Sequence, residues 1–592
     1  MTDVAPAPAR PVRRLALAAG GLVVVAAVTF GVLAPPEHCP TPSAPAVQAS
    51  ATAAVQWFVR NQNPDGTWLY EYDAQRDVVS DDYNFVRHAG AVMGLYQGAT
   101  AGIPGALESA DRGSAWVQER LVEHDGWTAL ATDGRAPVGA TALYVAALVE
   151  RRALTGDTTD DELLASLGRF LVAQTEPSGA VIAQYDATTM TPVAGSRSKY
   201  YTGEAYWALA RLHGVFGDDG FGAAADRIGA YLATARDDVE DLWPPIPDHW
   251  AAYGLAETAR FPERDPDRPL TDAELAYARR LAGLFGSQVR WVSQQAGPWG
   301  SVVRGTKVPR GGGYGVVGEA LAALWLTAGS EDRLADARAG IGARAECMAG
   351  LAIEVQDDGT GEGRPALAAG AWFIDGVTRM DDQQHATSAL LGTLAIVEAG
   401  PDAGHDEPNR GLWALALLAT LNPIFVALGL PRRSRPAERA ALAATGGIIG
   451  SLVVLAAAAV SGPLLDALDV SAAAARLAVG IVGAVAAVVR LARRPPGPQA
   501  GLDGWRAALV PVAVPLVAAP ALILLGLGAG ADLGTVFVAG CLVVGVGLLT
   551  VLAAWAPERG PWLTVAHWAH RLVCAIAGVA CILLVVSGVF AV

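Results

Sequence analysis

The sequence predicts an all-α protein in which a ring of helical hairpins, an (α/α)6 toroid, is joined to a polytopic bundle of membrane helices. Three observations predict this fold class. The 592 residues have a mean hydropathy of +0.32 and only 17% charged side chains, which is too apolar for a disordered chain or an ordinary soluble protein. Helical periodicity dominates residues 50–400. Long uncharged runs lie on both sides of that region, and the chain is too long for one compact domain.

The first uncharged run covers residues 15–34, about the ~20 residues that a helix needs to cross a bilayer. Three arginines within residues 10–14 precede it, so the positive-inside rule predicts a cytoplasmic tail over residues 1–14. A cleaved signal peptide is the alternative, but its apolar core usually has only ~7–15 residues and a small-residue cleavage site. We therefore expect an uncleaved transmembrane anchor, followed by a Pro-rich linker over residues 35–49.

Residues 50–400 consist of paired helices, and several first members end in a similar turn. The turns read QNPDGTW at residues 62–68, HDGW at 124–127 and QTEPSG at 174–179, where Gly and Asp supply the tight bend. Six pairs are expected, near residues 50–61/84–98, 113–122/138–152, 160–174/199–213, 222–236/247–260, 272–289/313–327 and 333–355/383–398. Each repeat exposes one apolar face that only stacking on neighbours buries, so we expect the hairpins to close into a ring.

After a linker at residues 401–410, the chain becomes apolar again over residues 411–592. Six runs lie near residues 411–430, 441–462, 473–492, 506–528, 532–555 and 567–590. The loops 431–440, 490–506 and 556–571 carry arginines, whereas those near 466–471 and 528–533 carry Asp and no basic residue. This alternation requires the first of the six helices to enter from outside, in agreement with the anchor. We expect a multi-pass plasma-membrane protein with residues 35–410 outside the cytoplasm.

The number of repeats and the Gln-x-x-x-Gly turns resemble the six-hairpin toroids of many carbohydrate-active enzymes and, with related winding, of terpene cyclases and prenyltransferases. The resemblance covers residues 50–400 and implies fold rather than function. It also implies that the second helix of each pair lines a central cavity. A prenyltransferase-type zinc set of Asp, Cys and His is not matched, because Cys347 lies in an outer helix, and the pairs at 81–82 and 381–382 do not fit a terpene-cyclase acid motif. No metal site and no cofactor is predicted.

Five of the six inner segments begin with acidic, His or Tyr residues, which would gather at one rim of the toroid. Such a rim favours a ligand site in which carboxylates act as acid and base and aromatic rings stack on sugars. Helix N-caps and satisfied polar side chains are the alternative for any single residue. The candidate catalytic residues are Asp82, Asp248, Asp382 and, one turn deeper, Glu204. The candidate ligand-binding residues are Arg87, His88, Tyr200, Tyr201, His249, Trp250, Tyr314 and His385, with Arg87 suited to an anionic group.

The cysteines and the net charge exclude several classes of protein. A formal charge of −15 argues against nucleic acid as a partner. Five cysteines without a CxxC pair exclude a disulfide scaffold. Cys39 and Cys347 are the only two on the outer side, and they either pair or remain two thiols. The other three, Cys541, Cys574 and Cys581, lie in membrane helices as small packing residues.

The membrane region resembles the MarC-type family of small membrane proteins, which is related to LysE-type exporters. The resemblance rests on Asn422-Pro423 in its first helix and on Pro511, Pro515 and Pro520 in its fourth. It implies that these interrupted helices line a transport path. The sequence shows almost no buried ionisable residues in these helices, however, whereas ion-coupled transporters usually have them. A bundle that only anchors the toroid is the alternative.

Two functions follow. In the first, the toroid is a glycosidase-like enzyme held outside the membrane, acting on or binding a cell-envelope or extracellular glycan. In the second, the protein is a transport or envelope-assembly component whose toroid captures a ligand without catalysis. The expected partners are a glycan or other small molecule and the lipid bilayer. The sequence does not predict the oligomeric state.

Overall fold

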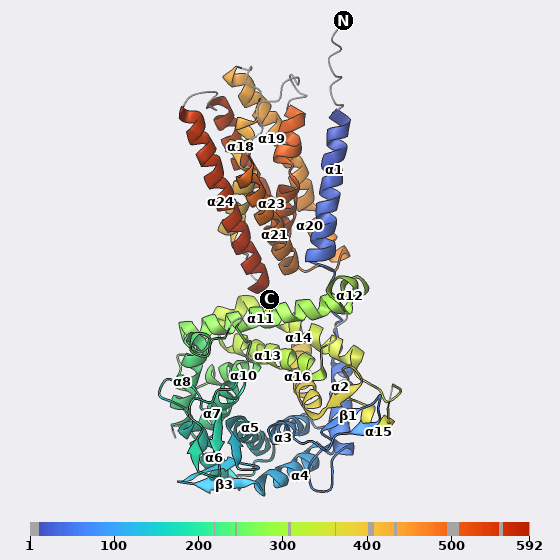
Figure 1. Ribbon diagram of the computed structural model, residues 1–592, viewed down its shortest axis with the longest axis vertical. Coiled ribbons are helices and arrows are strands. Elements are labelled where there is room, and N and C mark those ends of the chain that lie inside the picture. Colours follow the sequence, from blue (N-terminus) through green and yellow to red (C-terminus); the bar gives the residue numbers. More distant parts are fainter. Residues whose placement is uncertain are drawn as a thin grey trace. The chain divides into compact units, whose positions relative to one another are not determined.

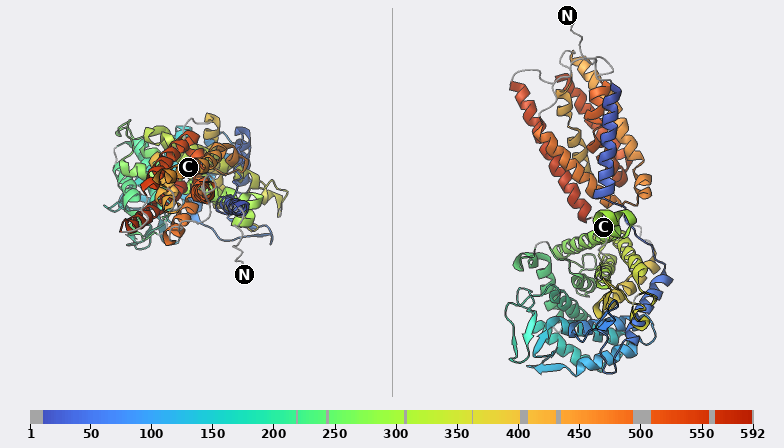
Figure 2. Two further views of the ribbon diagram at one scale, coloured as in Figure 1. Left: turned by 90° about the horizontal axis from the view of Figure 1, so that it is seen from above. Right: turned by 45° about the vertical axis from the view of Figure 1, so that its right-hand side comes forward.

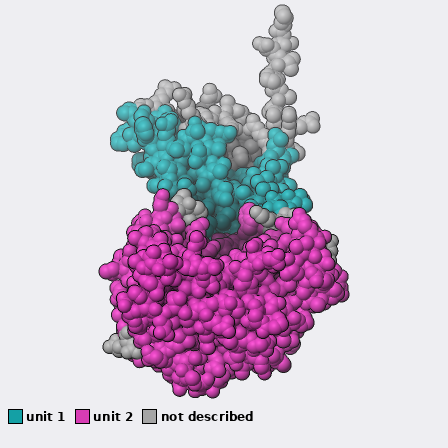
Figure 3. Space-filling model, turned by 60° about the horizontal axis from the view of Figure 1, so that its bottom comes forward, with its two compact units in different colours: residues 1–38, 297–306, 407–591 teal, residues 39–296, 307–406, 592 magenta. Residues whose placement is uncertain are grey.

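The computed structural model describes residues 11–217, 220–242, 245–305, 309–361, 363–400, 408–430, 435–493, 508–555 and 561–590. Its contacts divide the chain into two units (Figure 3). The bundle unit comprises Met1–His38, Gly297–Thr306 and Glu407–Ala591, and the toroid unit comprises Cys39–Ala296 and Lys307–Asp406. The segment Gly297–Thr306 therefore interrupts the toroid unit in sequence but belongs to the other unit by its contacts.

The toroid unit is a closed ring of six helical hairpins (Figure 1). Each inner helix contacts the next one around the ring, and the last contacts the first. The inner helices are α3 (Phe85–Thr100), α5 (Val138–Thr155), α7 (Tyr201–Phe216), α10 (His249–Thr258), α13 (Gly311–Ser330) and α16 (Met380–Ala399). The outer helices are α2 (Ala44–Arg60), α4 (Ala106–Gln118), α6 (Asp161–Ala173), α8 (Phe221–Thr234), α11 (Asp272–Ala296) and α14 (Ala335–Val355). The predicted (α/α)6 toroid is confirmed, with its six pairs in the predicted order.

The recurring turns fix how neighbouring hairpins stack. Gly66 and Gly179 both have positive φ values, +91° and +89°, which glycine adopts without strain. A Cβ at Gly66 would collide with the carbonyl of Arg112 in α4, and one at Gly179 with the carbonyl of Arg227 in α8. Each turn thus lets the end of one outer helix press on the backbone of the next outer helix. This contact explains why a glycine recurs in both turns.

Short strands precede several inner helices, and one sheet joins the first hairpin to the last. Strand β1 (Glu71–Asp73) pairs antiparallel with β2 (Val78–Val79) and with β8 (Val377–Arg379), with Tyr72 opposite Thr378. The other strands are β3 (Leu121–His124) paired with β4 (Trp127–Leu130), and β6 (Gln184–Asp186) paired with β5 (Arg135–Pro137) and β7 (Thr191–Pro192). Single helical turns are α9 (Arg236–Val239), η2 (Asp332–Leu334) and α15 (Pro365–Ala368). The β1–β8 pairing closes the ring with backbone hydrogen bonds.

A disulfide joins Cys39 to Cys347 in α14, so the structure resolves the open question of whether these two cysteines pair. The linker that follows lies tightly against α14, because a Cβ at Gly350 would collide with the carbonyl of Pro40. Cys541, Cys574 and Cys581 are free and buried in the bundle unit. The bond ties the start of the toroid unit to its sixth hairpin.

The bundle unit is entirely helical in its described part. The N-terminal helix α1 (Pro11–Val28), blue in the right-hand view of Figure 2, continues as η1 (Thr29–Leu33). It contacts α23. The later elements are α12 (Pro298–Arg304), α17 (Arg410–Leu421), α18 (Pro423–Leu428), α19 (Pro436–Ala459), α20 (Ser461–Ala467), α21 (Ala472–Ala492), η3 (Ala508–Val517), α23 (Pro520–Trp555) and α24 (Pro561–Phe590). Among the residues that the structure describes, six helices, Ala16–Leu33 among them, are long and apolar enough to cross a membrane.

The helical segment α23 contains the predicted run 532–555 and the second part of the run 506–528, whose first part includes η3. Its 36 residues would extend about 54 Å if straight, well beyond the ~30 Å of a bilayer core. The backbone is not helical at Gly534, where φ is 80° and ψ is 163°. Gly446 of α19 lies against Val512, before the interruption, and Gly447 lies against Val546, after it. The chain therefore reverses near Gly534, and all six predicted runs are found.

In the bundle unit, the non-basic loops lie at one end of the helices, and the described arginines next to the basic loops lie at the other end. The Glu37 N–H donates to the carbonyl of Asp469 (2.6 Å), and the Ser471 hydroxyl donates to Glu37 Oε1 (2.6 Å). Arg476 and Asp532 pair near this same end, with Nε 2.7 Å from Oδ2. The non-basic loops therefore meet the segment that follows α1. At the opposite helix ends, basic residues bind backbone carbonyls: Arg439 donates to Ala554 (3.3 Å), and Arg490 donates to Thr420.

The expectation of almost no buried ionisable residues in the bundle is wrong. The side chains of Arg476 and Asp532 are only 5% and 2% exposed. Trp413 Nε1 donates to the paired Asp532 oxygen (2.9 Å), and Arg476 Nη1 donates to the Ser587 hydroxyl (3.1 Å). His570 is also buried. The long apolar stretch of each run outweighs a single charge in its average hydropathy, so the run alone does not reveal such a pair.

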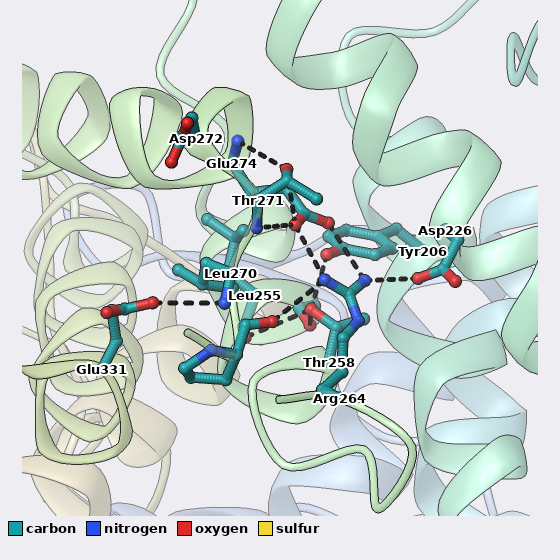
Figure 4. A network of polar contacts seen from close by, with 12 residues as sticks. Tyr206, Asp226, Leu255, Thr258, Arg264, Leu270, Thr271, Asp272, Glu274 and Glu331 are labelled. Atoms are coloured by element: carbon teal, nitrogen blue, oxygen red, sulfur yellow. Dashed lines mark hydrogen bonds and ion pairs between the residues drawn. The ribbon is translucent and has the colours of Figure 1, made fainter. Parts of the chain in front are cut away.

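A polar network ties α8, α10 and α11 together at one side of the ring (Figure 4). Arg264 donates to Glu274 Oε2 (2.9 Å), to Asp226 Oδ1 (2.5 Å) and to the carbonyl of Pro269 (3.0 Å). Glu274 is only 3% exposed and also accepts from the backbone N–H and hydroxyl of Thr271 (both 2.8 Å). Arg264 is therefore the counter-charge of a buried carboxylate that caps α11.

Replacing Arg264 with Met should lower the stability of the toroid unit by about 3 kcal/mol, because Glu274 would be left buried without its partner. The matched control is Arg268→Met, which removes the solvent-exposed pair between Arg268 and Asp272 and should cost less than about 1 kcal/mol. The measurement is the unfolding midpoint of the purified full-length protein, followed by tryptophan fluorescence. Equal midpoints for the two variants would contradict the assignment.

Candidate functional site

The inner helices begin at one common end of the ring, here called the rim. Contacts between their first turns show this. A Cβ at Gly139, the second residue of α5, would collide with Glu204 and Tyr201 at the start of α7. Gly203 of α7 similarly abuts Asp248, which caps α10, and the N–H of Gly312 in α13 donates to Asp382 of α16 (2.8 Å). The first turns of α5 and α7, of α7 and α10, and of α13 and α16 therefore lie side by side.

Three side chains from consecutive inner helices meet just below the rim. His385 Nδ1 lies 2.7 Å from Glu319 Oε2, and His249 Nε2 lies 3.9 Å from the same oxygen. The imidazole rings of the two histidines are 5.3 Å apart. Glu319 is fully buried and also accepts from Gln384 Nε2 (3.3 Å). The group of His249, Glu319 and His385 is here called the His–Glu–His cluster.

The two histidines of this cluster have opposite electrostatic environments. Burial, together with the nearby His385, lowers the pKa of His249 well below its ordinary value. Burial also disfavours the charged form of His385, but the Glu319 carboxylate offsets this and raises the pKa of His385. His249 is 2% exposed and neither of its ring nitrogens has a hydrogen-bond partner among the described residues, whereas the side chain of His385 is 17% exposed. The neutral form of His249 and the charged form of the partly exposed His385 are therefore favoured.

The same three residues could also hold a metal ion. One ligand atom of each lies within 4.8 Å of the others, and two imidazoles with one carboxylate suit several transition metals. The His385–Glu319 hydrogen bond would then have to give way to coordination. The geometry therefore permits a metal and does not require one.

Aromatic rings close the inner side of this cluster. Trp250 stacks on Trp207, with ring centroids 5.4 Å apart and planes inclined by 19°. Tyr253 stacks on Trp207 at 4.6 Å, and Trp250 lies 5.7 Å from the His385 ring. These rings keep water from one side of the two histidines, which strengthens electrostatic interactions among the charged groups.

Two of the predicted catalytic carboxylates, Asp248 and Glu204, lie side by side in the protein interior, and Asp248 has structural partners. Asp248 is fully buried, binds Arg236 Nη1 (2.7 Å) and accepts from the N–H of Trp250 (3.1 Å) as the N-cap of α10. Glu204 lies next to it and is 4% exposed. Burial, and then the negative charge of Asp248, raise the pKa of Glu204 well above its ordinary value. The neutral form of the buried Glu204 carboxyl is therefore favoured, and Asp248 holds the start of α10.

A charged group at the start of α16 contains two further predicted residues. Asp382 is 1% exposed and accepts from Gly312, and burial, together with the neighbouring Asp381, raises its pKa. Arg87 Nε binds Asp381 Oδ2 (3.1 Å), and Arg379 Nη2 binds the same oxygen (3.2 Å). Arg87 is thus already paired, although its side chain remains 30% exposed. It would reach an anionic substrate group only in competition with Asp381.

The remaining predicted ligand residues lie in different places. Tyr200 is 46% exposed and its ring lies 6.4 Å from that of His249, so it belongs to the rim. Tyr201 is half-buried against α5. Tyr314 is buried in α13, and burial raises its pKa to about 12. Asp82 is exposed in the loop before α3.

His88 faces away from the rim cluster. Its Nε2 lies 2.9 Å from the carbonyl of Gly113 in α4, and its Nδ1 lies 2.6 Å from the Tyr83 hydroxyl. The ring also packs on Trp68 and Trp116. His88 is thus a hydrogen-bonded residue of the core between α3 and α4, and helical periodicity alone did not reveal which face it occupies.

The predicted transport-path residues lie at helix interruptions of the bundle unit. Asn422 has a positive φ of 45° between α17 and α18, its Oδ1 accepts from the Phe425 N–H (3.1 Å), and its Nδ2 lies 3.0 Å from His570 Nδ1. Pro423 begins α18. Pro511 and Pro515 lie within η3, and Pro520 begins α23. The interruptions exist, and transport through them stays a prediction.

Glu319 and Gln384 were not among the predicted site residues. Glu319 lies nine residues into α13, too deep to be a helix cap, yet it is the only charged residue in GGGYGVVGEALAALWLTAGS. A lone carboxylate on an apolar helix is rarely buried without a role. The tripeptide Gly-Glu-Ala occurs at Glu319 and again at Glu204, on two inner helices. This repeated tripeptide was the sequence feature that could have indicated Glu319 as a site residue.

Comparisons with known proteins yield distant structural likenesses only. No protein-family model and no curated protein matches the chain. Cellobiose 2-epimerase from Spirochaeta thermophila is similar over 67% of this chain and 99% of its own, at 13% identity and a TM-score of 0.42. The α-mannanase from Bacteroides thetaiotaomicron is similar over 58% and 94%, at 10% identity and a TM-score of 0.38. A type II terpene cyclase from Scytonema is similar over 60% of this chain and 98% of its own, at 12% identity and a TM-score of 0.38. These values carry no information on the chemistry of this chain.

Acidification should destabilise the toroid unit through His88. Burial lowers the pKa of His88 to about 4, below its value of about 6.5 in an unfolded chain. The stability that this group contributes is therefore present above pH 6.5 and is lost as the pH falls toward 4, by about 3 kcal/mol in total. The unfolding midpoint of the full-length protein, measured across this range, should fall less steeply in His88→Gln than in the wild type.

The control is His124→Gln, which removes a partly exposed histidine from β3 and should leave the pH dependence as in the wild type. Parallel curves for His88→Gln and the wild type would show that His88 does not carry this effect.

Proposed function

We propose that the toroid unit is an enzyme that acts on a saccharide by general acid–base catalysis, with His385 as the acid and His249 as the base. The observation that supports this most is the opposite environment of the two imidazoles around one buried carboxylate. Two neighbouring titratable groups whose pKa values are pushed apart are a recurring arrangement for acid and base roles. His249 offers a lone pair, and His385 offers a proton that Glu319 keeps on the ring.

The proposed role of Glu319 is to position and charge His385 rather than to contact substrate, because Glu319 is fully buried. The hydrogen bond to Nδ1 leaves Nε2 of His385 as the nitrogen that would face the ligand. The stacked rings of Trp250 and Trp207 would exclude water from behind the pair.

A saccharide suits the rim because polar side chains around it can bind hydroxyl groups. Tyr200 is 46% exposed at the rim and would offer a ring face and a hydroxyl. A glycosidase mechanism through the predicted aspartates is less well supported. Asp248 and Asp382 are both almost completely buried and hold helix starts, and Asp248 is also neutralised by Arg236.

The proposed location is outside the cytoplasm, with the bundle unit crossing the plasma membrane. The charge alternation of the loops and the arginines before α1 support this orientation. A disulfide in the toroid unit is also typical of an oxidising compartment. A glycan of the cell envelope or the surroundings would then be the substrate.

Transport or ligand capture remains the second candidate, favoured by the interruption at Asn422 and by the buried pair of Arg476 and Asp532. Ionisable groups inside a membrane often belong to a transport path. The described polar atoms of Asn422 and of this pair are engaged with protein partners, however, which suits a structural role as well.

Activity should show a bell-shaped pH dependence of kcat/KM that spans pH 6.5. It should fall as acid protonates His249, whose pKa lies below the ordinary value, and as base deprotonates His385, whose pKa lies above it. His249→Gln and His385→Gln should each lower kcat by about 10²–10⁴-fold. The assay incubates full-length protein in D2O with a panel of oligosaccharides and envelope glycans. Proton NMR then detects both bond cleavage and hydrogen exchange at carbon.

The matched control is Asp82→Asn, which changes an exposed rim-side carboxylate and should retain wild-type activity. Loss of activity in Asp82→Asn with retention in both histidine variants would contradict the proposal. Turnover that is abolished by a chelator and restored by a metal ion would replace acid–base catalysis with metal chemistry at the same residues. Binding without turnover of any glycan would favour ligand capture.

The orientation predicts which sites a membrane-impermeant maleimide reaches on intact cells. Glu123→Cys, at an exposed position of β3, should be labelled without lysis, whereas Arg435→Cys, in a basic loop, should be labelled only after lysis. The wild-type chain is the blank because its five cysteines are either disulfide-bonded or buried. The reverse labelling pattern would place the toroid unit in the cytoplasm.

A further inference from the structure

The short helix α12 lies in sequence between two helices of the toroid unit but belongs to the bundle unit. It connects α11 to α13, and contacts assign the whole segment Gly297–Thr306 to the bundle unit. A connection between the two helices of a hairpin needs only a few residues. This segment leaves its own hairpin to contact the N-terminal helix instead.

Hydrogen bonds fix the level at which α12 meets that helix. Trp299 Nε1 donates to the carbonyl of Gly31 (2.8 Å), and Arg304 Nη2 donates to the carbonyl of Leu33 (2.9 Å). Both carbonyls belong to η1, the last turn of the apolar stretch Ala16–Leu33. These are carbonyls at a helix C-terminus, which lack partners within their own helix. The segment therefore sits where the apolar stretch ends.

One face of α12 exposes apolar side chains. Trp299 is 53% and Val302 is 74% exposed, and residues three apart share a helix face. Gly300 is buried on another side. In the bundle unit, comparable exposure of large apolar side chains occurs along α1 itself, where Val23 is 66% exposed. The Trp299–Val302 face thus has the exposure of a lipid-facing surface, at the end of a stretch long enough to span a bilayer.

We propose that α12 is an interfacial membrane segment, whose Trp299–Val302 face inserts between the headgroups and acyl chains of the leaflet in which α1 ends. Tryptophan is enriched at this depth because its ring is apolar and its indole N–H is polar. Here the N–H is satisfied by Gly31, so the rest of the ring can enter the apolar layer without an unpaired donor. The occupant of the exposed face is lipid, and the segment would be a membrane attachment within the fifth hairpin.

This proposal rests on α1 crossing the bilayer, and it does not depend on the enzymatic activity. It differs from the spans themselves because α12 has only seven residues, far fewer than a crossing needs. In this proposal α12 is attached because it lies at the level of the lipid headgroups and because its Trp299–Val302 face is apolar. Removing the apolar face should therefore leave the spans in place and affect only this contact.

The test places an environment-sensitive NBD label at position 302 through Val302→Cys in full-length protein, reconstituted into nanodiscs that contain doxyl-labelled phospholipid. Emission should fall by about half or more with the nitroxide near the headgroup and less with the nitroxide deep in the chain. The same label at Val23→Cys, within α1, should be quenched more by the deep nitroxide. The label at Glu123→Cys, on β3 of the toroid unit, should be quenched by neither.

Quenching at position 23 without quenching at position 302 would overturn the proposal. Quenching at neither position would show that α1 does not cross the bilayer, and the proposal would fall with that premise. A disulfide-linked dimer through Cys at position 302 would identify a second copy of the chain as the occupant and would also overturn it. If Val302→Cys does not fold, the wild type is compared with Trp299→Phe. Both proteins are measured in brominated lipid. The tryptophan fluorescence that is absent from Trp299→Phe should be the part that bromine near the headgroups quenches in the wild type.

Discussion

The contact between the last hairpin and the first is the constraint on which the toroid unit depends. Six hairpins in a row would leave the two outermost apolar faces in water, and only a closed ring buries both. Here α16 packs on α3 and α2, and β8 pairs with β1. Around the ring, α16 is also the neighbour of α13, and α13 is the neighbour of α10. The His–Glu–His cluster is formed by these three consecutive inner helices.

The chemistry of the rim follows from burial more than from composition. A carboxylate enclosed by apolar helices is costly unless a partner carries the opposite charge. Glu319 meets this demand with His385, and Asp248 meets it with Arg236. The two pairs have different consequences. The arginine cannot give up its proton, so Asp248 is fixed in a structural role, whereas the imidazole can exchange its proton with a ligand.

The helical repeat was predictable because its turns and its apolar period are local properties, and all six pairs were found close to their predicted residues. The partners of side chains were not predictable in the same way. His88 and His385 both lie at the start of an inner helix, yet one faces α4 and the other faces Glu319. Which neighbour each histidine faces depends on the rotation of its helix about the helix axis and on residues that are distant in sequence. The pairing of Arg476 with Asp532 was not predicted for a related reason, since each is a single charge in or beside a long apolar run.

The bond between Cys39 and Cys347 spans 308 residues of sequence. A chain that is synthesised from its N-terminus presents the second cysteine only after five of the six hairpins have been made. The linker therefore stays unattached while most of the ring assembles, and its oxidation coincides with the arrival of α14. A truncated product that ends before the sixth hairpin would keep Cys39 as a reactive thiol, and would thereby be chemically distinguishable from the finished protein.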